Sequence, residues 1–294
     1  MTERQWLAEK FEENRAHLRA VAYRILGSAT EADDAVQETW LRLDRSDDTT
    51  IDNLGAWLTT VVSRICLDML RSRGSRREDP LETESSEPPA VSAGQPNPEQ
   101  QAMLADSVGV ALLVVLDRLD PAERLAFVLH DMFAVPFEEI ASIVGRTPEA
   151  ARQLASRARR CVQGPAEVSA SERIQQRKVV DAFLGALRAG DFEGLIKVLD
   201  PDVAVHIDET AARPGAPREI RGARAWAKGA VAFSQMARSI QPALVDGAVG
   251  LIWAPGGRLA RALKFKFESG KIAEVEIIAD PARLGELDLG VLPD

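Results

Sequence analysis

The chain of 294 residues has little cysteine, histidine or tyrosine and no long apolar run. Its two cysteines, Cys66 and Cys161, lie far apart in segments of helical pattern. They therefore form no disulfide framework and supply too few ligands for a metal site, and we expect small buried thiols. No stretch approaches the roughly 18–20 apolar residues of a membrane helix, and the N-terminus lacks a basic start followed by an apolar segment. We expect a cytoplasmic protein without membrane contact, metal or cofactor.

Charge is distributed unevenly along the chain, although the net charge is only −9. Residues 78–106 contain seven acidic residues and no lysine or arginine. Residues 63–77 contain five arginines against one aspartate. A basic block therefore adjoins an acidic one, and the net charge does not exclude a nucleic-acid partner.

The acidic segment also divides the chain. It carries five prolines among Ser, Glu, Gln and Gly, so residues 78–106 are predicted to be a linker. Apolar residues recur at helical spacing on both sides of it, which predicts an all-helical domain over 1–77 and a second over 107–164. The overall expectation is a multidomain chain, in which residues 172–294 form a third domain of the α+β class.

The third domain begins with two helical segments, 172–189 and 191–199, that meet at Gly190. Short β-like runs follow, and Ser269-Gly270 is a hairpin signal between the last two of them. One more helix is expected over 222–236. We predict helices on one side of a curved sheet, with strands over 203–208, 243–245, 249–254, 259–268 and 271–279.

Residues 117–160 predict a helix-turn-helix. Residues 136–144 form a short helix, Gly145 allows a sharp turn, and Thr147 can cap a second helix that has Pro148 at its first position. Small residues at i, i+4 and i+7 (Ala151, Ala155 and Ala158) can pack on the first helix. Long polar side chains then face outward, as in a helix that reads DNA, although an ordinary solvated helix pair would look similar.

The N-terminal domain supplies a second pattern. Residues 33–42 (DDAVQETWLR) place acidic and amide groups beside a tryptophan, and residues 57–71 carry basic residues one or two turns apart. With the helix-turn-helix and the acidic linker, these segments resemble the extracytoplasmic-function sigma factors of bacterial RNA polymerase. The resemblance covers roughly residues 11–162.

The resemblance implies two partners, core RNA polymerase and promoter DNA, and no catalysis. Helix 33–42 would dock on the polymerase through Asp33, Asp34, Gln37, Glu38 and Trp40. The 43–57 loop would open the minus-10 element beside Arg64, Arg71, Arg73, Arg76 and Arg77. The helix-turn-helix would read the minus-35 element through Arg152, Gln153, Ser156, Arg157 and Arg160. The linker would run toward the RNA exit channel.

The third domain resembles the SnoaL-like fold, which a subgroup of these sigma factors carries as a regulator in cis. Asp280, Pro281, Arg283 and Leu284 belong to a segment that resembles the terminal Asn-Pro-Asp-Lys-Leu motif of that subgroup. Residues 255–258 (PGGR) resemble its Gly-rich turn, whereas its Trp-Leu-Pro-Glu-Pro linker motif is missing. The resemblance implies interdomain regulation through these residues, in response to an unidentified small molecule or protein.

Two other classes of protein stay open from the sequence. In an enzyme of the SnoaL-like type, His206, Asp208 and Glu209 could act as acid and base. A repressor with a ligand-sensing domain would use the helix-turn-helix without polymerase. The aromatic residues Trp226, Phe233, Trp253, Phe265 and Phe267 are expected in the core of the third domain, where any of them could line a pocket.

Overall fold

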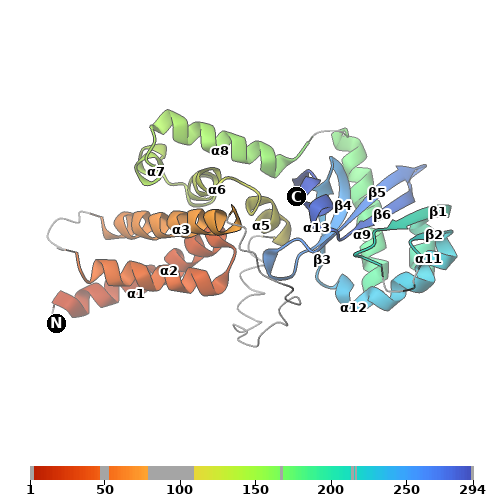
Figure 1. Cartoon of the computed structure of the whole chain (residues 1–294), viewed down its shortest axis with the longest axis horizontal. Helices are drawn as coiled ribbons and strands as arrows, with labels where there is room; N and C mark the ends of the chain where they lie inside the picture. The colour runs from red at the N-terminus through yellow and green to blue at the C-terminus, as the bar shows by residue number, and fades with distance from the viewer. Residues whose placement is uncertain are drawn as a thin grey trace. The chain divides into compact units, whose positions relative to one another are not determined.

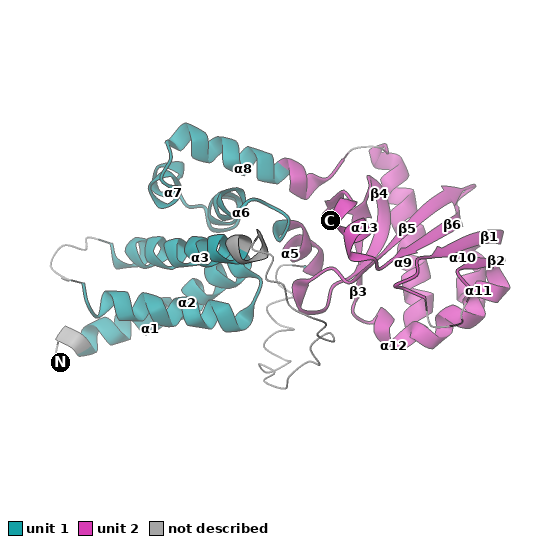
Figure 2. Ribbon diagram, viewed as in Figure 1, with its two compact units in different colours: residues 1–109, 116–159 teal, residues 110–115, 160–294 magenta. Residues whose placement is uncertain are grey.

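The computed structural model describes residues 3–46, 53–78, 109–165, 168–212, 215 and 217–292. It contains two compact units, drawn in teal and magenta in Figure 2. Unit 1 spans residues 1–109 and 116–159, and unit 2 spans residues 110–115 and 160–294. Nearly all of the predicted linker, and the centre of the 43–57 loop, lie outside the described residues.

Unit 1 begins with three helices, α1 (Glu3–Leu26), α2 (Ala29–Leu43) and α3 (Leu54–Glu78), which pack against one another. Leu18, Val21 and Ile25 are fully buried and lie on one face of α1. The α2 helix starts where the Ser28 hydroxyl accepts a hydrogen bond from the Glu31 N–H at 3.4 Å. The predicted all-helical N-terminal domain is confirmed.

The second part of unit 1 contains α6 (Pro121–Phe127), the π-helical segment η2 (Val128–Met132), α7 (Phe137–Val144) and α8 (Pro148–Gln163). Gly145 ends α7 in the left-handed conformation at φ +69°, which a side chain would disfavour. The Thr147 hydroxyl then accepts a hydrogen bond from the Ala150 N–H at 3.2 Å and starts α8. The predicted helix-turn-helix is therefore present, and Figure 1 shows α7 and α8 joined by this turn.

Unit 2 is built on a seven-stranded sheet in the order β2-β1-β6-β5-β4-β3-β7. The β1 and β6 strands are parallel, and the other neighbours are antiparallel. The strands are β1 (Leu199–Ile207), β2 (Glu219–Arg221), β3 (Ile240–Val245), β4 (Ala248–Trp253), β5 (Arg261–Glu268), β6 (Lys271–Ile278) and β7 (Leu289–Gly290). The sequence predicted five of these, but β2 and β7 are too short to show alternation.

Helices accompany the sheet in unit 2, where α9 (Ala170–Ala189) is the longest. The single helix predicted over 222–236 is wrong, because the backbone tightens to a 3-10 turn and leaves helical geometry at Phe233 (φ −99°, ψ 10°). The remaining pieces are α5 (Val110–Leu116), α10 (Phe192–Val198), α11 (Ala223–Ala230), η3 (Val231–Phe233), α12 (Ser234–Ala237), η4 (Pro255–Gly257) and α13 (Pro281–Glu286).

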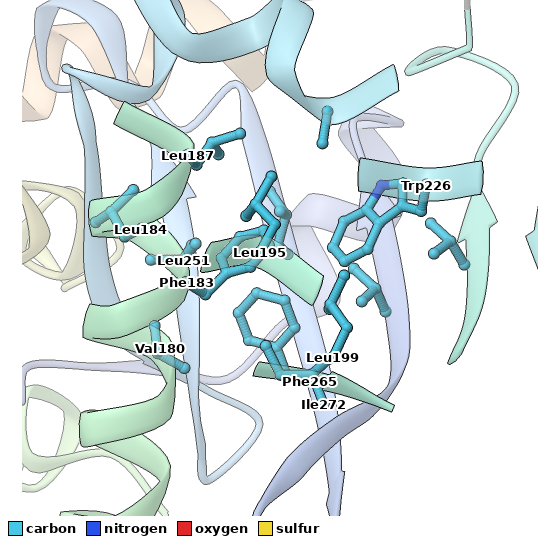
Figure 3. Packing of buried hydrophobic residues seen from close by; sticks show 14 of the residues in the cluster. Val180, Phe183, Leu184, Leu187, Leu195, Leu199, Trp226, Leu251, Phe265 and Ile272 are labelled. Carbon is cyan, nitrogen blue, oxygen red and sulfur yellow. The ribbon is translucent and has the colours of Figure 1, made fainter. Parts of the chain in front are cut away.

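The core of unit 2 falls into two clusters. The larger one, here the cone core, includes Phe183, Trp226, Leu251 and Phe265 (Figure 3). The Phe183 and Trp226 rings stack at 5.3 Å. The second cluster, here the α5 core, joins apolar residues of α5 to the sheet and to α13, and its members include Ala111, Val114, Val115, Ala262, Ile278 and Leu284. Adjacent strand residues point to opposite faces, which lets one sheet serve both clusters.

Candidate nucleic-acid and polymerase interfaces

The α8 helix has one buried and one exposed face. Ala151, Ala155 and Ala158 are fully buried, as their spacing predicted. The polar residues between them reach solvent, since Arg152, Gln153, Ser156, Arg157 and Arg160 are all exposed. The structure therefore brings all five predicted minus-35 contacts together on one exposed helix surface.

Contacts within unit 1 orient two of these side chains. The Arg152 guanidinium lies 5.1 Å from the Phe137 ring centroid, which is a cation–π geometry. Arg157 lies 3.7 Å from a Glu123 carboxylate oxygen, and it shares a surface hollow of about 190 Å³ with Arg146 and Gln153. Long donors at the start of such a helix can pair with base edges, while Arg160 near its end suits a phosphate.

The arginines of α3 have different surroundings. Arg64 is exposed and donates a hydrogen bond at 3.2 Å to the backbone carbonyl of Ser142, at the far end of α7. Arg71 is exposed, and Arg76 and Arg77 lie in the last turns of α3, where only the backbone is described. These residues remain predictions as promoter contacts.

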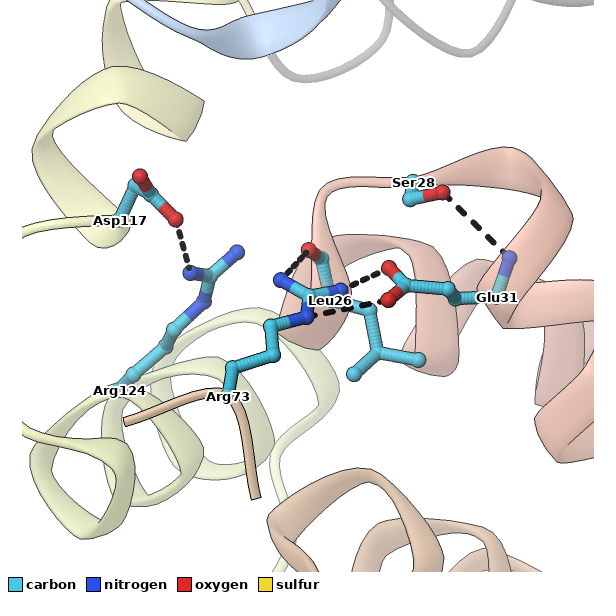
Figure 4. Close-up of polar contacts among 6 residues, drawn as sticks. All are labelled: Leu26, Ser28, Glu31, Arg73, Asp117 and Arg124. Carbon is cyan, nitrogen blue, oxygen red and sulfur yellow. Dashed lines mark hydrogen bonds and ion pairs between the residues drawn. The ribbon is translucent and has the colours of Figure 1, made fainter. Parts of the chain in front are cut away.

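Arg73 is used inside unit 1. Its guanidinium forms a two-pronged ion pair with Glu31, and it donates to the Leu26 carbonyl at 3.2 Å (Figure 4). The side chain is about 30% exposed. It ties α3 to the α1–α2 junction, and this link explains its position without DNA. The sequence predicts Arg73 as a DNA contact because it lies in the basic run. Its partner Glu31 lies 42 residues earlier, so no local sequence pattern indicates the ion pair.

The α2 helix presents a polar face. Asp33, Asp34 and Gln37 are exposed, and Glu38 is half-buried and pairs with Arg42 at 3.0 Å. Asp33 accepts from Arg19 at 2.6 Å, whereas Trp40 is half-buried with its ring 5.1 Å from that of Phe11. The exposed Leu41 continues the face one turn after Gln37. Helical spacing would have identified Leu41 as a further surface residue.

The predicted interdomain segment forms a capped helix. The Asp280 carboxylate accepts from the Arg283 N–H at 3.0 Å, Pro281 occupies the first position of α13, and Arg283 pairs with Glu276. Leu284 is buried in the α5 core. This segment therefore lies in the same cluster as α5.

Comparisons with known proteins identify the family. Residues 11–76 match Sigma-70 region 2, and residues 109–162 match Sigma-70 region 4. The chain is 40% identical over 285 residues to the ECF RNA polymerase sigma factor SigJ of Mycobacterium tuberculosis, an alignment that covers 92% of this chain and 91% of SigJ. The chain belongs to the ECF sigma factors.

Two solved structures are similar to this chain or to part of it. A crystal structure of Mycobacterium tuberculosis SigJ is 35% identical, with a TM-score of 0.45, and covers 95% of this sigma factor and 98% of that chain. An NTF2-like protein of unknown function from Cytophaga hutchinsonii is 17% identical, with a TM-score of 0.25, over 38% of this chain and 95% of its own. The predicted fold class is confirmed, because two helical sigma regions precede an α+β domain with a mixed seven-stranded sheet.

The family assignment makes this sigma factor an initiation factor, which binds core polymerase and promoter DNA, and neither an enzyme nor a repressor. The residues of the enzyme alternative have other partners. Asp208 accepts hydrogen bonds from the N–H groups of Ala211, Ala279 and Asp280 at 2.6–2.8 Å. Glu209 pairs with Arg218 at 2.6 Å, and His206 lies 3.9 Å from Glu274. Asp208 therefore fixes the turn that leads into α13.

The two thiols of the sigma factor differ. Cys66 is buried in α3, and this burial raises the pKa of its thiol to about 12. The expectation of burial is wrong for Cys161, which is exposed because it lies beside the alanine stripe of α8. Within the described ranges we find no cluster of potential metal ligands and no helix long and apolar enough to cross a membrane.

Proposed function

We propose that this ECF sigma factor is controlled in cis by its C-terminal domain, which holds both ends of region 4. We also propose that it contacts core polymerase through the polar face of α2 and promoter DNA through α3 and α8. The residues are those that the sequence predicts, with Arg73 left out because Glu31 engages it.

The packing of α5 carries the proposal of control in cis. The match to region 4 begins at residue 109, so α5 is the first helix of that region. Residues 110–115 nevertheless belong to unit 2, where Val114 and Val115 are almost fully buried in the α5 core. The Val110 N–H also donates to the Gln241 side chain of β3 at 3.1 Å.

The other end of region 4 is also attached to unit 2. Residues 160–163 complete α8, and the carbonyl of Val162 accepts a hydrogen bond at 2.7 Å from the Val291 N–H. Val162 itself packs against the α5 core. The predicted domain covers residues 107–164, whereas the compact units assign residues 110–115 and 160–164 of that range to unit 2.

Burial gives this attachment its strength. Fully burying a valine stabilises by roughly 1.5–3 kcal/mol, so Val114 and Val115 together with Leu284 hold α5 firmly. Without the sheet, the apolar face of α5 would lie in water. We infer that the domain supports region 4, and that its loss weakens minus-35 recognition more than polymerase binding.

The experiment is run-off transcription with core polymerase, which compares the full chain with a chain ending at Gly164 on promoters with and without a minus-35 element. A second pair separates docking from loss of the domain. Val115→Asp introduces charge into the α5 core, whereas Ile174→Asp changes an apolar side chain that is 57% exposed on α9.

We expect the truncated chain and Val115→Asp to bind core polymerase but to lose minus-35-dependent transcription, while Ile174→Asp matches the unmodified chain. A truncated chain that is equally or more active would overturn the supporting role. Failure of every variant, including the full chain, to bind core polymerase would overturn the assigned contacts of α2.

A further inference from the structure

The cone core of unit 2 contains a cavity of about 300 Å³. Its walls are mostly apolar and come from α9, α11, η3, α12, the segment after β1, and the strands β1, β2, β3, β5 and β6, with Phe183, Trp226, Phe233, Met236, Leu263 and Ile277 among the lining residues. A cavity of this size lies at the lower end of the range for small-molecule sites, which is about 300–1,000 Å³.

One charged side chain lines this cavity in the described part of unit 2. Arg261 opens β5 directly opposite Trp253 of β4, and its guanidinium carbon lies 6.0 Å from the centroid of the Trp253 ring. Among the described residues we find no carboxylate paired with Arg261. Trp226 also lines the cavity, and its ring stacks on that of Phe183 at 5.3 Å.

Arg188 of the same unit has a structural role that Arg261 lacks. Arg188, near the end of α9, donates to the backbone carbonyls of Ala237 at 3.0 Å and Ile240 at 2.7 Å. It thereby fixes α12 and the start of β3. Arg261 makes no such bonds in the described structure, so its guanidinium can bind an external anion.

We propose that the cavity binds a small amphipathic carboxylic acid, with its apolar body inside and its carboxylate on Arg261. A guanidinium pairs with a carboxylate through two parallel N–H donors, and the apolar wall supplies burial for a chain or ring of modest size. An uncharged molecule of the same shape would leave the guanidinium without an anion. The site therefore selects for the carboxylate.

The position of the cavity suggests how binding reaches region 4, a step that rests on the proposed function. Arg261, Leu263 and Ile277 line the cavity, whereas Ala262 and Ile278 belong to the α5 core. The same two strands therefore contact the ligand on one face and the α5 core on the other. A ligand that tightens these strands would tighten the attachment of α5.

The test is isothermal titration calorimetry of the full chain with octanoate and, as its uncharged counterpart, 1-octanol. Arg261→Gln removes the charge, and Ala230→Phe fills the cavity at a wall residue that is 8% exposed. Arg224→Gln, at an exposed position on α11, is the matched control. Circular dichroism checks that each variant is folded. Binding is measured without polymerase or DNA, so its outcome is independent of the transcription assay.

We expect saturable binding of one octanoate per chain, about tenfold tighter than that of octanol. Arg261→Gln should remove this preference, and Ala230→Phe should abolish binding of both, while Arg224→Gln has no effect. Absence of saturable binding, equal binding of octanol, or binding that survives both Arg261→Gln and a folded Ala230→Phe would overturn the proposal. If Ala230→Phe does not fold, Arg261→Gln alone decides.

Discussion

Gly164 and Gly290 approach each other so closely that a side chain on Gly290 would collide with the backbone of Gly164. A β-carbon on Gly290 would lie 2.8 Å from the Cα of Gly164 and 2.9 Å from its nitrogen. Gly164 also ends α8 at φ +66°, a conformation that favours glycine. The β7 strand thus touches the backbone that closes the DNA-reading helix, next to the hydrogen bond between Val291 and Val162.

Gly290→Ala should therefore detach the end of α8 from β7. The new methyl group meets backbone that cannot rotate away, so we expect the free energy of unfolding to fall by about 1–3 kcal/mol. Thermal unfolding and run-off transcription from a minus-35 promoter measure the effect. Gly185→Ala, in open space on α9, is the control and should be neutral or slightly stabilising. Unchanged transcription in a destabilised Gly290→Ala chain would show that this attachment is not needed for promoter reading.

The α8 side chains that we propose to read bases and those that we propose to bind phosphates should respond differently to substitution. Arg152→Ala should cost about 1–3 kcal/mol of binding and relax the preference at one base pair of the minus-35 element. Arg160→Ala should weaken all sequences equally and reduce the slope of log K against log salt by about one. Titration of the holoenzyme on single-substituted promoters at several salt concentrations separates the two. An equal loss of affinity for all promoter sequences in Arg152→Ala would mean that Arg152 contacts the phosphate backbone and not a base.

The ion pair between the buried Arg124 and the exposed Asp117 predicts opposite effects when one or the other partner is replaced (Figure 4). Arg124 is 3% exposed and donates to Asp117 at 3.3 Å, while Asp117 is 42% exposed. Burial lowers the pKa of Arg124 because its charge is poorly solvated. Asp117→Asn should lower the free energy of unfolding by about 1–2 kcal/mol, whereas Arg124→Met should be neutral or stabilising.

Urea denaturation of the two single variants and the double variant tests this prediction. Asp117→Asn should have little further effect once Arg124 is Met, because no buried charge is left to compensate. Additive losses in the double variant would contradict the account.

The Asp208 carboxylate makes the stability of unit 2 depend on pH. Partial burial by itself would raise the pKa of Asp208, but hydrogen bonds from the N–H groups of Asp280, Ala279 and Ala211, together with the charge of Arg283, outweigh it and lower the pKa. A carboxyl with a lowered folded pKa stabilises fully above its unfolded value of about 3.9 and loses that contribution as the pH falls through the folded value.

Asp208→Asn should accordingly cost about 2 kcal/mol at pH 7, and the difference from the unmodified chain should shrink on acidification below about pH 4. Urea unfolding at pH 7 and pH 3 measures both. Asp202→Asn, at an exposed position on β1, is the control. If Asp208→Asn lowers the free energy of unfolding equally at pH 7 and pH 3, the substitution destabilises for a steric reason and not through loss of the charge.

The two thiols should react at very different rates with a thiol reagent. Cys161 is exposed, whereas the pKa of Cys66 stands at about 12, which leaves almost no thiolate at neutral pH. One thiol of the native protein should react rapidly and release one equivalent of chromophore from the reagent. Cys161→Ser should abolish this rapid reaction. Two rapid equivalents would mean that α3 opens readily.

Much of the fold was predictable because its signals are local. Caps and periodicity predicted the helix-turn-helix through Gly145, Thr147 and the alanine stripe of α8. The docking of α5 could not be predicted, since its short apolar pattern fits any helix core and its partners lie more than a hundred residues later, among them Ile252 and Leu284.

The candidate site was predictable to a similar degree. Exposure of Arg152, Gln153 and Arg157 followed from the helical period, and the same period could have placed Cys161 outside the buried stripe. The use of Arg73 by Glu31 and the cavity beside Arg261 are products of tertiary packing. No spacing along the chain indicates either of them.

The alternation along β5 has an evolutionary consequence. Arg261 and Leu263 face the cavity, while Ala262 between them faces the α5 core. Under the proposed control in cis, neighbouring codons would experience different selective pressures, one from the chemistry of the ligand and the other from the packing of α5. Descendants of this gene could acquire a new inducer through substitutions at every second position, and their promoters would stay the same.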